Sequence, residues 1–124
     1  MIPKQKKFRS KKYLMWVANK PCLLCMTEPC QAHHITIAEH RGFGQKVSDN
    51  YTIPLCYPHH HLLHMTGERK FWQKLGINPK FYSELLYVTY NQNKLEYDQY
   101  LWENMYKKVT PLIKANIDFL TSVK

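Results

Sequence analysis

The sequence predicts an α+β fold in which a small β-hairpin and a helix hold metal, with further helices after them. All four cysteines and all seven histidines of the 124-residue chain lie between positions 22 and 64. Such clustering is typical of metal ligands. Beyond this region apolar residues recur at helical spacing, and no internal repeat or linker divides the chain. We therefore expect a metal-binding module at residues 13–75 and a helical extension packed on it at residues 76–124.

Two short strands are expected inside the module. Residues 32–37 are rich in β-branched and aromatic side chains and predict the first strand. Residues 38–50 have loop composition and lead to residues 51–55, the returning strand, where Pro54 is tolerated only at an edge or a strand end. Before the strands, the apolar run at residues 13–20 predicts a helix turn or a strand beneath the metal site.

Helices are expected after the strands. Proline suits the first turn of a helix, so one helix should begin near Pro58 and run to about Met65. A second should span residues 68–75 and stop at Gly76.

Two further start signals lie in the extension. Asn78 followed by proline predicts a helix at residues 79–90, whose apolar face consists of Phe81, Leu85 and Val88. Residues 95–108 show similar spacing. Thr110-Pro111 repeats the start signal for a last helix, with an apolar stripe formed by Ile113, Ile117 and Leu120.

The formal net charge of +9 indicates a polyanionic partner. Basic residues are concentrated in the first twelve positions, which contain no acidic residue: Lys4, Lys6, Lys7, Arg9, Lys11 and Lys12. We expect residues 1–12 to be a disordered tail that binds DNA phosphates. The alternative is a solvated arm that only aids solubility.

The sequence contains no run of about 18 apolar residues, so no membrane partner is expected. The N-terminus lacks the apolar core and cleavage site of a signal peptide. In such a chain, four cysteines indicate metal ligands more readily than disulfides. We expect a cytoplasmic protein.

A closed structural zinc site is expected from two short motifs. Cys22-x2-Cys25 and Cys56-x2-His59 each have the spacing that delivers two zinc ligands at once. Four such ligands leave no position for a substrate. Cys30 could replace His59 or Cys22, although a free, buried thiol is the favoured interpretation.

A second, open metal site is expected from the remaining histidines. His60 and His64 lie four residues apart and should project from one helix face. His33 can supply a third ligand from the first strand. Three protein ligands with open positions form the arrangement of catalytic metals. His34 points to the other side of the strand and is free to act as a base on water.

The order of these motifs resembles the HNH, or His-Me finger, nucleases, whose ββα-metal module has this layout. Three segments look closer still to phage Ref-type (recombination-enhancement) nucleases. They are residues 31–35 (Gln-Ala-His-His-Ile), residues 42–49 and residues 53–67. The last of these segments ends in Cys-x2-His-His-x3-His-x2-Gly. The resemblance covers roughly residues 20–75.

The resemblance implies His34 as general base and His33, His60 and His64 around a catalytic Mg²⁺, Mn²⁺ or Zn²⁺. The middle asparagine of the HNH name has no clear counterpart. Asp49 and Asn50 both lie near its place, and we favour Asp49, which would orient the far nitrogen of His34.

We therefore expect a metal-dependent HNH endonuclease or nickase that hydrolyses DNA phosphodiester bonds. Resemblance alone indicates phage or prophage DNA recombination, with a recombinase filament as a partner. The basic tail, together with Arg41 and Lys46, would hold the DNA backbone. Two alternatives remain, a non-catalytic zinc-binding DNA adaptor and a protein that binds or cleaves RNA.

Overall fold

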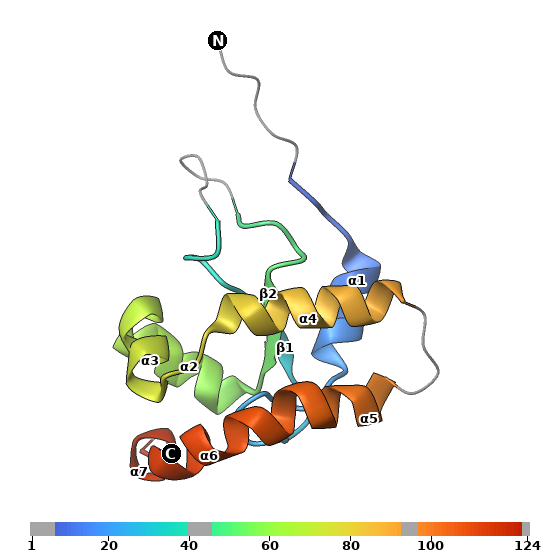
Figure 1. Cartoon of the computed structure of the whole chain (residues 1–124). Coiled ribbons are helices and arrows are strands. Elements are labelled where there is room, and N and C mark those ends of the chain that lie inside the picture. The colour runs from blue at the N-terminus through green and yellow to red at the C-terminus, as the bar shows by residue number, and fades with distance from the viewer. Residues whose placement is uncertain (1–6, 40–45, 93–96, 123–124) are drawn as a thin grey trace.

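The computed structural model describes residues 7–39, 46–92 and 97–122 (Figure 1). The fold is α+β, as predicted. No helix in these ranges is long and apolar enough to cross a membrane. Along the chain the elements are α1 (Lys11–Ala18), β1 (Gln31–His34), β2 (Thr52–Leu55), α2 (Tyr57–Thr66), α3 (Glu68–Leu75), α4 (Pro79–Asn91), α5 (Tyr97–Leu101), a π-helical segment (Trp102–Tyr106), α6 (Lys107–Ala115) and α7 (Ile117–Leu120).

β1 and β2 run antiparallel, with His33 opposite Ile53 and Ala32 opposite Pro54. In the described ranges each strand pairs only with the other, so Pro54 occupies the edge position that its missing N–H requires. The Pro54 carbonyl accepts a hydrogen bond from the Leu23 amide at 2.9 Å. This bond ties the loop that carries the first two cysteines to the sheet.

The first strand is shorter than predicted. β1 ends at His34 instead of residue 37. The Ile35 amide still donates to the Tyr51 carbonyl at 2.9 Å, but the amide of Ala38 donates to the Ile35 carbonyl at 3.0 Å, and this turn ends the strand pairing after residue 35. β2 begins at Thr52, one residue after the predicted start.

The N-terminal helix begins earlier than residue 13, which corrects two predictions. Ser10 caps α1, because its side-chain oxygen accepts a hydrogen bond from the Tyr13 amide at 3.1 Å. The predicted boundary between residues 12 and 13 falls inside α1. Residues 7–12 therefore belong to the folded domain and are not a disordered tail, whereas residues 1–6 lie outside the described ranges.

The helices that follow the sheet match their predicted bounds closely. α2 has Cys56 as its N-cap and Pro58 in its first turn. α3 spans residues 68–75, as predicted, and ends at Gly76, whose φ of 71° is the left-handed conformation that glycine adopts most readily. α4 is capped by Asn78, whose side chain accepts from the Phe81 amide at 3.3 Å.

The predicted apolar face of α4 is wrong at two of its three positions, because only Leu85 packs against the core. Phe81 is 54% exposed and Val88 is 48% exposed. The buried face instead contains Ser83, Leu86 and Thr89. The two hydroxyl groups are satisfied within the helix, because Ser83 donates to the Lys80 carbonyl and Thr89 donates to the Leu85 carbonyl, each at 2.7 Å. Small hydroxyl residues can therefore face the core, and hydrophobicity alone selected the wrong side.

The predicted helix start at Thr110-Pro111 is also wrong. Pro111 lies inside α6, and Thr110 donates its hydroxyl to the Tyr106 carbonyl at 2.8 Å instead of capping a helix. Leu101, Met105 and Val109 are buried on one continuous face. Burial of this face stabilises the helix on both sides of Pro111, so tertiary packing outweighs the helix-breaking effect of the proline.

A single apolar core joins the sheet to the helices. β2, the residue that follows β1 and most helices contribute side chains that are at most 1% exposed, among them Ile35, Ile53, Leu55, Leu63, Phe71, Leu86, Leu101 and Val109. The chain segments that carry cysteine and histidine are thereby fixed on closely packed elements.

Candidate functional site

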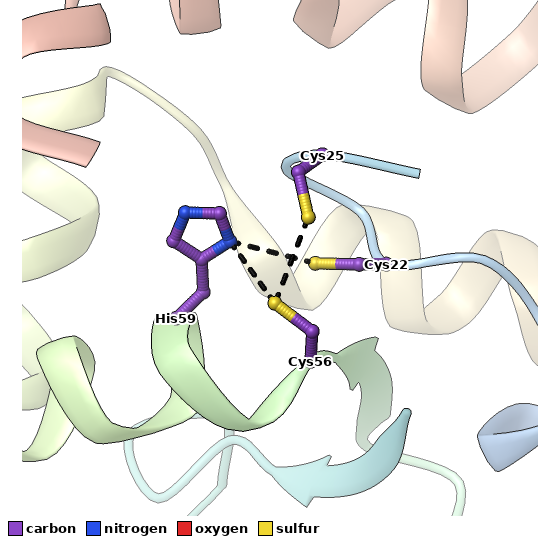
Figure 2. A group of neighbouring side chains, drawn as sticks. All are labelled: Cys22, Cys25, Cys56 and His59. Atoms are coloured by element: carbon purple, nitrogen blue, oxygen red, sulfur yellow. Dashed lines mark hydrogen bonds between the residues drawn. The ribbon is translucent and has the colours of Figure 1, made fainter. Parts of the chain in front are cut away.

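The first cluster of metal-ligand side chains joins the loop before β1 to the start of α2. Cys22 and Cys25 lie in that loop, Cys56 is the N-cap of α2, and His59 lies in the first turn of α2. Figure 2 shows the three sulfur atoms and the imidazole directed towards a common centre. Their ligand atoms all lie within 4.8 Å of one another. The structure thus brings together the whole predicted set.

Distances within this cluster fit a tetrahedral zinc ion. Sγ of Cys25 lies 3.6 Å from Sγ of Cys56. Nδ1 of His59 lies 3.3 Å from the Cys56 sulfur and 3.8 Å from the Cys22 sulfur. Zinc–ligand bonds of about 2.3 Å to sulfur and about 2.0–2.1 Å to nitrogen place tetrahedral ligands about 3.6–3.8 Å apart. The donor set is compatible with zinc.

The thiols of this cluster are difficult to ionise side by side. The hydrogen bond with Cys22, followed by burial, raises the pKa of Cys25 to about 12. Burial and the neighbouring Cys22 and Cys25 raise the pKa of Cys56 to about 12. A group of thiolates here therefore needs a cation that compensates their charge, which a structural zinc ion supplies.

Two neighbouring contacts define the limits of the cluster. Cys30 lies outside it and donates its thiol to the Thr27 carbonyl at 3.1 Å, so the geometry does not favour Cys30 as a substitute ligand. Nε2 of His59 lies 3.2 Å from the carbonyl oxygen of Leu120. A carbonyl can only accept, so Nε2 carries the proton and Nδ1 is left to face the sulfur atoms.

The second cluster contains His33 from β1 and two histidines of α2. Nε2 of His60 lies 3.1 Å from Nδ1 of His33 and 3.0 Å from Nε2 of His64. These ligand atoms also lie within 4.8 Å of one another. Three nitrogens bound to one zinc ion at about 2.0–2.1 Å would be about 3.3 Å apart. The predicted trio therefore converges at a separation close to that of a metal site.

The outer nitrogens of two of these rings are held by oxygen acceptors. Nε2 of His33 lies 3.1 and 3.0 Å from the two carboxylate oxygens of Glu68. Nδ1 of His60 contacts the side-chain oxygen of Gln31. The protons of both rings are thus assigned to the outer nitrogens, and lone pairs point inwards. Lone pairs that face one another repel unless a cation lies between them, as in the carboxylate–histidine–metal arrangement.

Protonation states support this assignment. Burial, followed by the neighbouring His33 and His64, lowers the pKa of His60 to about 4, so its imidazole is neutral at pH 7. Burial alone would raise the pKa of Glu68. Hydrogen bonds with His33, with the Thr36 amide at 2.8 Å and with Trp72 Nε1 at 3.0 Å outweigh that effect and lower it. Glu68 therefore remains a carboxylate beside His33.

His34 lies next to this cluster but has different partners. Its Nε2 lies 2.9 Å from Oδ1 of Asp49, the residue favoured from the sequence as its orienting partner. His34 and Lys46 line the same cavity of about 250 Å³ as the three clustered histidines. With Nε2 held by the carboxylate, Nδ1 of His34 is the nitrogen that can accept a proton.

The predicted DNA-binding residues have different outcomes. Lys4, Lys6 and Arg41 lie outside the described ranges. Lys7 pairs with Glu39 at 3.4 Å. The exposed Lys11 and Lys46 line a second cavity of about 390 Å³ that shares His34 with the first. Lys12 is exposed in the first turn of α1. Arg9 bonds to backbone carbonyls of residues 46 and 47.

Sequence reasoning missed Glu68 and Gln31, although each had a signal. Glu68 lies four residues after His64 and continues the spacing of the two helix histidines. Gln31 lies two residues before His33 and therefore on the same face of the strand. Polar residues at these spacings were the available indication that the histidine rings have hydrogen-bond acceptors behind them.

Comparison with known proteins identifies a family. The chain matches the family described as "Protein of unknown function (DUF968)" over residues 1–92. That segment includes both clusters and ends just after α4. The uncharacterized protein YdfU of Escherichia coli (strain K12) is 30% identical over 90 residues, which are 70% of this chain and 26% of that protein. The chain thus spans about a quarter of the length of this relative. No solved structure gives a significant match. Because the family match covers well over half of its residues, the chain belongs to the DUF968 family.

Proposed function

We propose that the protein is a metal-dependent endonuclease of the HNH type that hydrolyses phosphodiester bonds in DNA. One observation carries the proposal. The ligand nitrogens of three histidines lie within 4.8 Å of one another, and a fourth histidine, oriented by a carboxylate, lines the same cavity. A metal ligand set beside a free base is the combination that hydrolysis of a phosphodiester requires.

His34 takes the role of general base. Asp49 fixes the imidazole with its proton on Nε2, so that Nδ1 can remove a proton from a water molecule. After proton transfer the imidazolium lies 2.9 Å from the Asp49 carboxylate, whose side chain is 7% exposed. A buried negative charge at this distance stabilises the imidazolium and so favours the transfer.

His33, His60 and His64 hold the catalytic cation. A bound divalent metal would neutralise charge on the scissile phosphate and on the leaving 3′ oxygen. Imidazole nitrogens suit Zn²⁺ and other transition metals better than Mg²⁺, which prefers oxygen ligands. Among the cations expected from the sequence, Zn²⁺ should therefore occupy this site more readily than Mn²⁺ or Mg²⁺.

The cysteine cluster has a structural role in this proposal. Zinc held by Cys22, Cys25, Cys56 and His59 has four protein ligands and no open position. It connects the loop before β1 to the first turn of α2, the helix that carries His60 and His64. The structural ion thus keeps the catalytic helix next to the strand that carries His33.

The nucleic-acid substrate is inferred from charge. Exposed Lys11 and Lys46 line a cavity together with His34, and Lys12 is exposed on the same helix as Lys11, in a chain of net charge +9. Contacts of this kind bind phosphates without reading sequence. Action in phage recombination, with a recombinase filament as partner, rests on the resemblance of residues 20–75 to Ref-type nucleases.

The proposal is tested by cleavage of supercoiled plasmid and single-stranded DNA, with Mg²⁺, Mn²⁺ or Zn²⁺ supplied in turn. His34→Ala should lose about 10²–10⁴-fold in cleavage rate while retaining metal content and DNA affinity. His61→Ala is the matched control, because His61 lies on the same helix as His60 but faces Tyr57 and solvent. It should cleave like the parent.

Two results would reject the DNA endonuclease. If the parent binds DNA but cleaves neither the plasmid nor the single-stranded DNA with any of these metals, the zinc-binding DNA adaptor becomes the better interpretation. If it cleaves RNA and not DNA, the RNA-acting alternative is correct. Full activity of His34→Ala would be consistent with the nuclease proposal but would show that His34 is not its general base.

A further inference from the structure

The Asp49 carboxylate is enclosed by the N-terminal segment of the chain. Its Oδ2 accepts a hydrogen bond from the Ser10 amide at 2.7 Å. Its Oδ1, which contacts His34, also lies 3.5 Å from a terminal nitrogen of Arg9. A carboxylate that is 7% exposed has little access to water, so these partners take the place of solvent as its hydrogen-bond donors. Two of the three come from residues 9 and 10.

Arg9 also fixes the chain on which Asp49 lies. One terminal nitrogen donates to the Val47 carbonyl at 2.8 Å, and the other donates to the Lys46 carbonyl at 2.8 Å. The Asp49 amide donates in return to the Phe8 carbonyl at 2.9 Å. The planar guanidinium spans two successive carbonyls, which a single ammonium group cannot reproduce.

Phe8 secures the segment on its other side. Its ring packs edge-on against Tyr87 of α4, with centroids 5.3 Å apart, and against Tyr13 of α1 at 6.4 Å. Its amide donates to the side chain of Ser48 at 3.3 Å. Residues 8–10 are thus held between an aromatic cluster and residues 46–49, which lead into β2.

We propose that Arg9 is a positioning residue for the nuclease reaction, acting through Asp49 on the His34 base, and not a DNA-contacting residue of a flexible tail. This inference rests on the proposed function. The segment from Phe8 to Ser10 is then part of the active site, although it lies outside residues 20–75, which carry the nuclease resemblance. The pair of hydrogen bonds from the Arg9 guanidinium to the carbonyls of residues 46 and 47, here called the Arg9 fork, should therefore affect kcat and not the affinity for DNA.

Arg9→Lys separates the two roles, because it keeps the charge and removes the fork. A phosphate contact depends mainly on charge, so the DNA-contact interpretation expects near-normal activity from Arg9→Lys and a loss in Arg9→Gln. The positioning role expects both variants to lose about 10²-fold in kcat, the scale of a misplacement of about 1 Å. In both variants KM and the salt dependence of DNA binding should stay near those of the parent.

Kinetics are measured at saturating metal with a fluorescent oligonucleotide cleaved by the parent. A raised KM and a reduced salt slope, with kcat unchanged, would overturn the positioning role in favour of a DNA contact. So would rescue of kcat by Arg9→Lys. Lys11→Gln is the comparison variant, because it removes one charge two residues away, and it should change KM and the salt slope.

A second measurement does not depend on nuclease activity. The Ser10 and Asp49 amides should exchange slowly with deuterated solvent in the parent, because both donate hydrogen bonds to partners held by Arg9 and Phe8. Faster exchange at both amides in Arg9→Lys would show that Arg9 holds the Asp49 segment in place. This result would stand even if the parent cleaves nothing, in which case only the proposed function fails. Unchanged exchange at both amides would show that Arg9 does not hold the Asp49 segment, and would reject its positioning role.

Discussion

Acidification should release the zinc ion that we propose for the cysteine cluster and should unfold the domain. With zinc bound, the thiolates of Cys22, Cys25 and Cys56 carry no proton, whereas the thiols of the unfolded chain are protonated below about pH 8.5. The unfolded state therefore binds three more protons, so stability rises with pH and is lost as the pH falls. Without zinc the sign is reversed, because the raised pKa values of Cys25 and Cys56 favour protonated thiols in the fold.

The expected magnitude follows from the number of thiols in the cluster. Each displaced proton changes the free energy of zinc binding by about 1.4 kcal/mol per pH unit. Three protons give about 4 kcal/mol per unit, or about 6 kcal/mol between pH 7 and pH 5.5. A domain of this size has a total stability of about 5–15 kcal/mol. Loss of zinc over this interval should therefore bring unfolding with it.

Circular dichroism and zinc release to a chromogenic chelator follow this transition at a fixed zinc concentration. The logarithm of the apparent zinc affinity should change by about three per pH unit near pH 7 and by up to about four below pH 6.5, where His59 of the zinc-free unfolded chain also takes up a proton. Cys56→Ser should unfold already at pH 7, whereas the matched variant Cys30→Ser should behave like the parent, because the Cys30 thiol lies outside the cluster. A slope below one, or equal damage from both substitutions, would refute the assigned ligand set.

Three further predictions concern other parts of the molecule. Glu68→Gln should weaken metal binding at the histidine cluster by about 10–100-fold in a competition titration, because the carboxylate behind His33 is removed; an effect equal to that of the exposed control Glu84→Gln would contradict this role. Leu86→Ala should lower the free energy of unfolding by about 2–5 kcal/mol, as expected for a fully buried leucine, whereas Phe81→Ala should change it by less than about 1 kcal/mol; denaturant titration compares the two, and the reverse order would restore the face predicted from sequence. Deletion of residues 1–6 should lower the log–log salt slope of duplex binding by roughly 0.9 for each phosphate that the segment neutralises, and an unchanged slope would assign these residues to solubility alone.

The parts of the fold that depend on local signals could be predicted from the sequence. Pro58, Asn78 and Gly76 each act on the backbone next to them, and the helices they delimit have the expected bounds. Zinc-ligand spacing is equally local, because Cys22-x2-Cys25 and Cys56-x2-His59 must each face one centre. Residue spacing therefore predicted the cysteine cluster and the His60–His64 pair as groups of neighbouring side chains, and metal binding at them stays a prediction.

The features that depend on distant packing could not be predicted. Thr110-Pro111 has the local form of a helix start, but burial of Met105 and Val109 continues the helix through it. Hydrophobic periodicity predicted that the exposed face of α4 was the buried one. It could not indicate that Ser83 and Thr89 face the core, because their hydroxyl groups bond to carbonyls within their own helix. The Arg9 fork joins residues almost forty positions apart and leaves no mark on the local sequence.

The hydrogen bond from His59 to the Leu120 carbonyl joins a residue inside the family match to one beyond it. A carbonyl belongs to the main chain, so any amino acid at position 120 could provide it. The acceptor is thus independent of the side chain at that position, which is constrained instead by packing, because Leu120 is 3% exposed within the core. A hybrid that combines residues 1–92 of this chain with the downstream part of a relative must place some acceptor at the same point. Otherwise the ring can adopt the other tautomer and present a proton, instead of a lone pair, to the sulfur-lined centre.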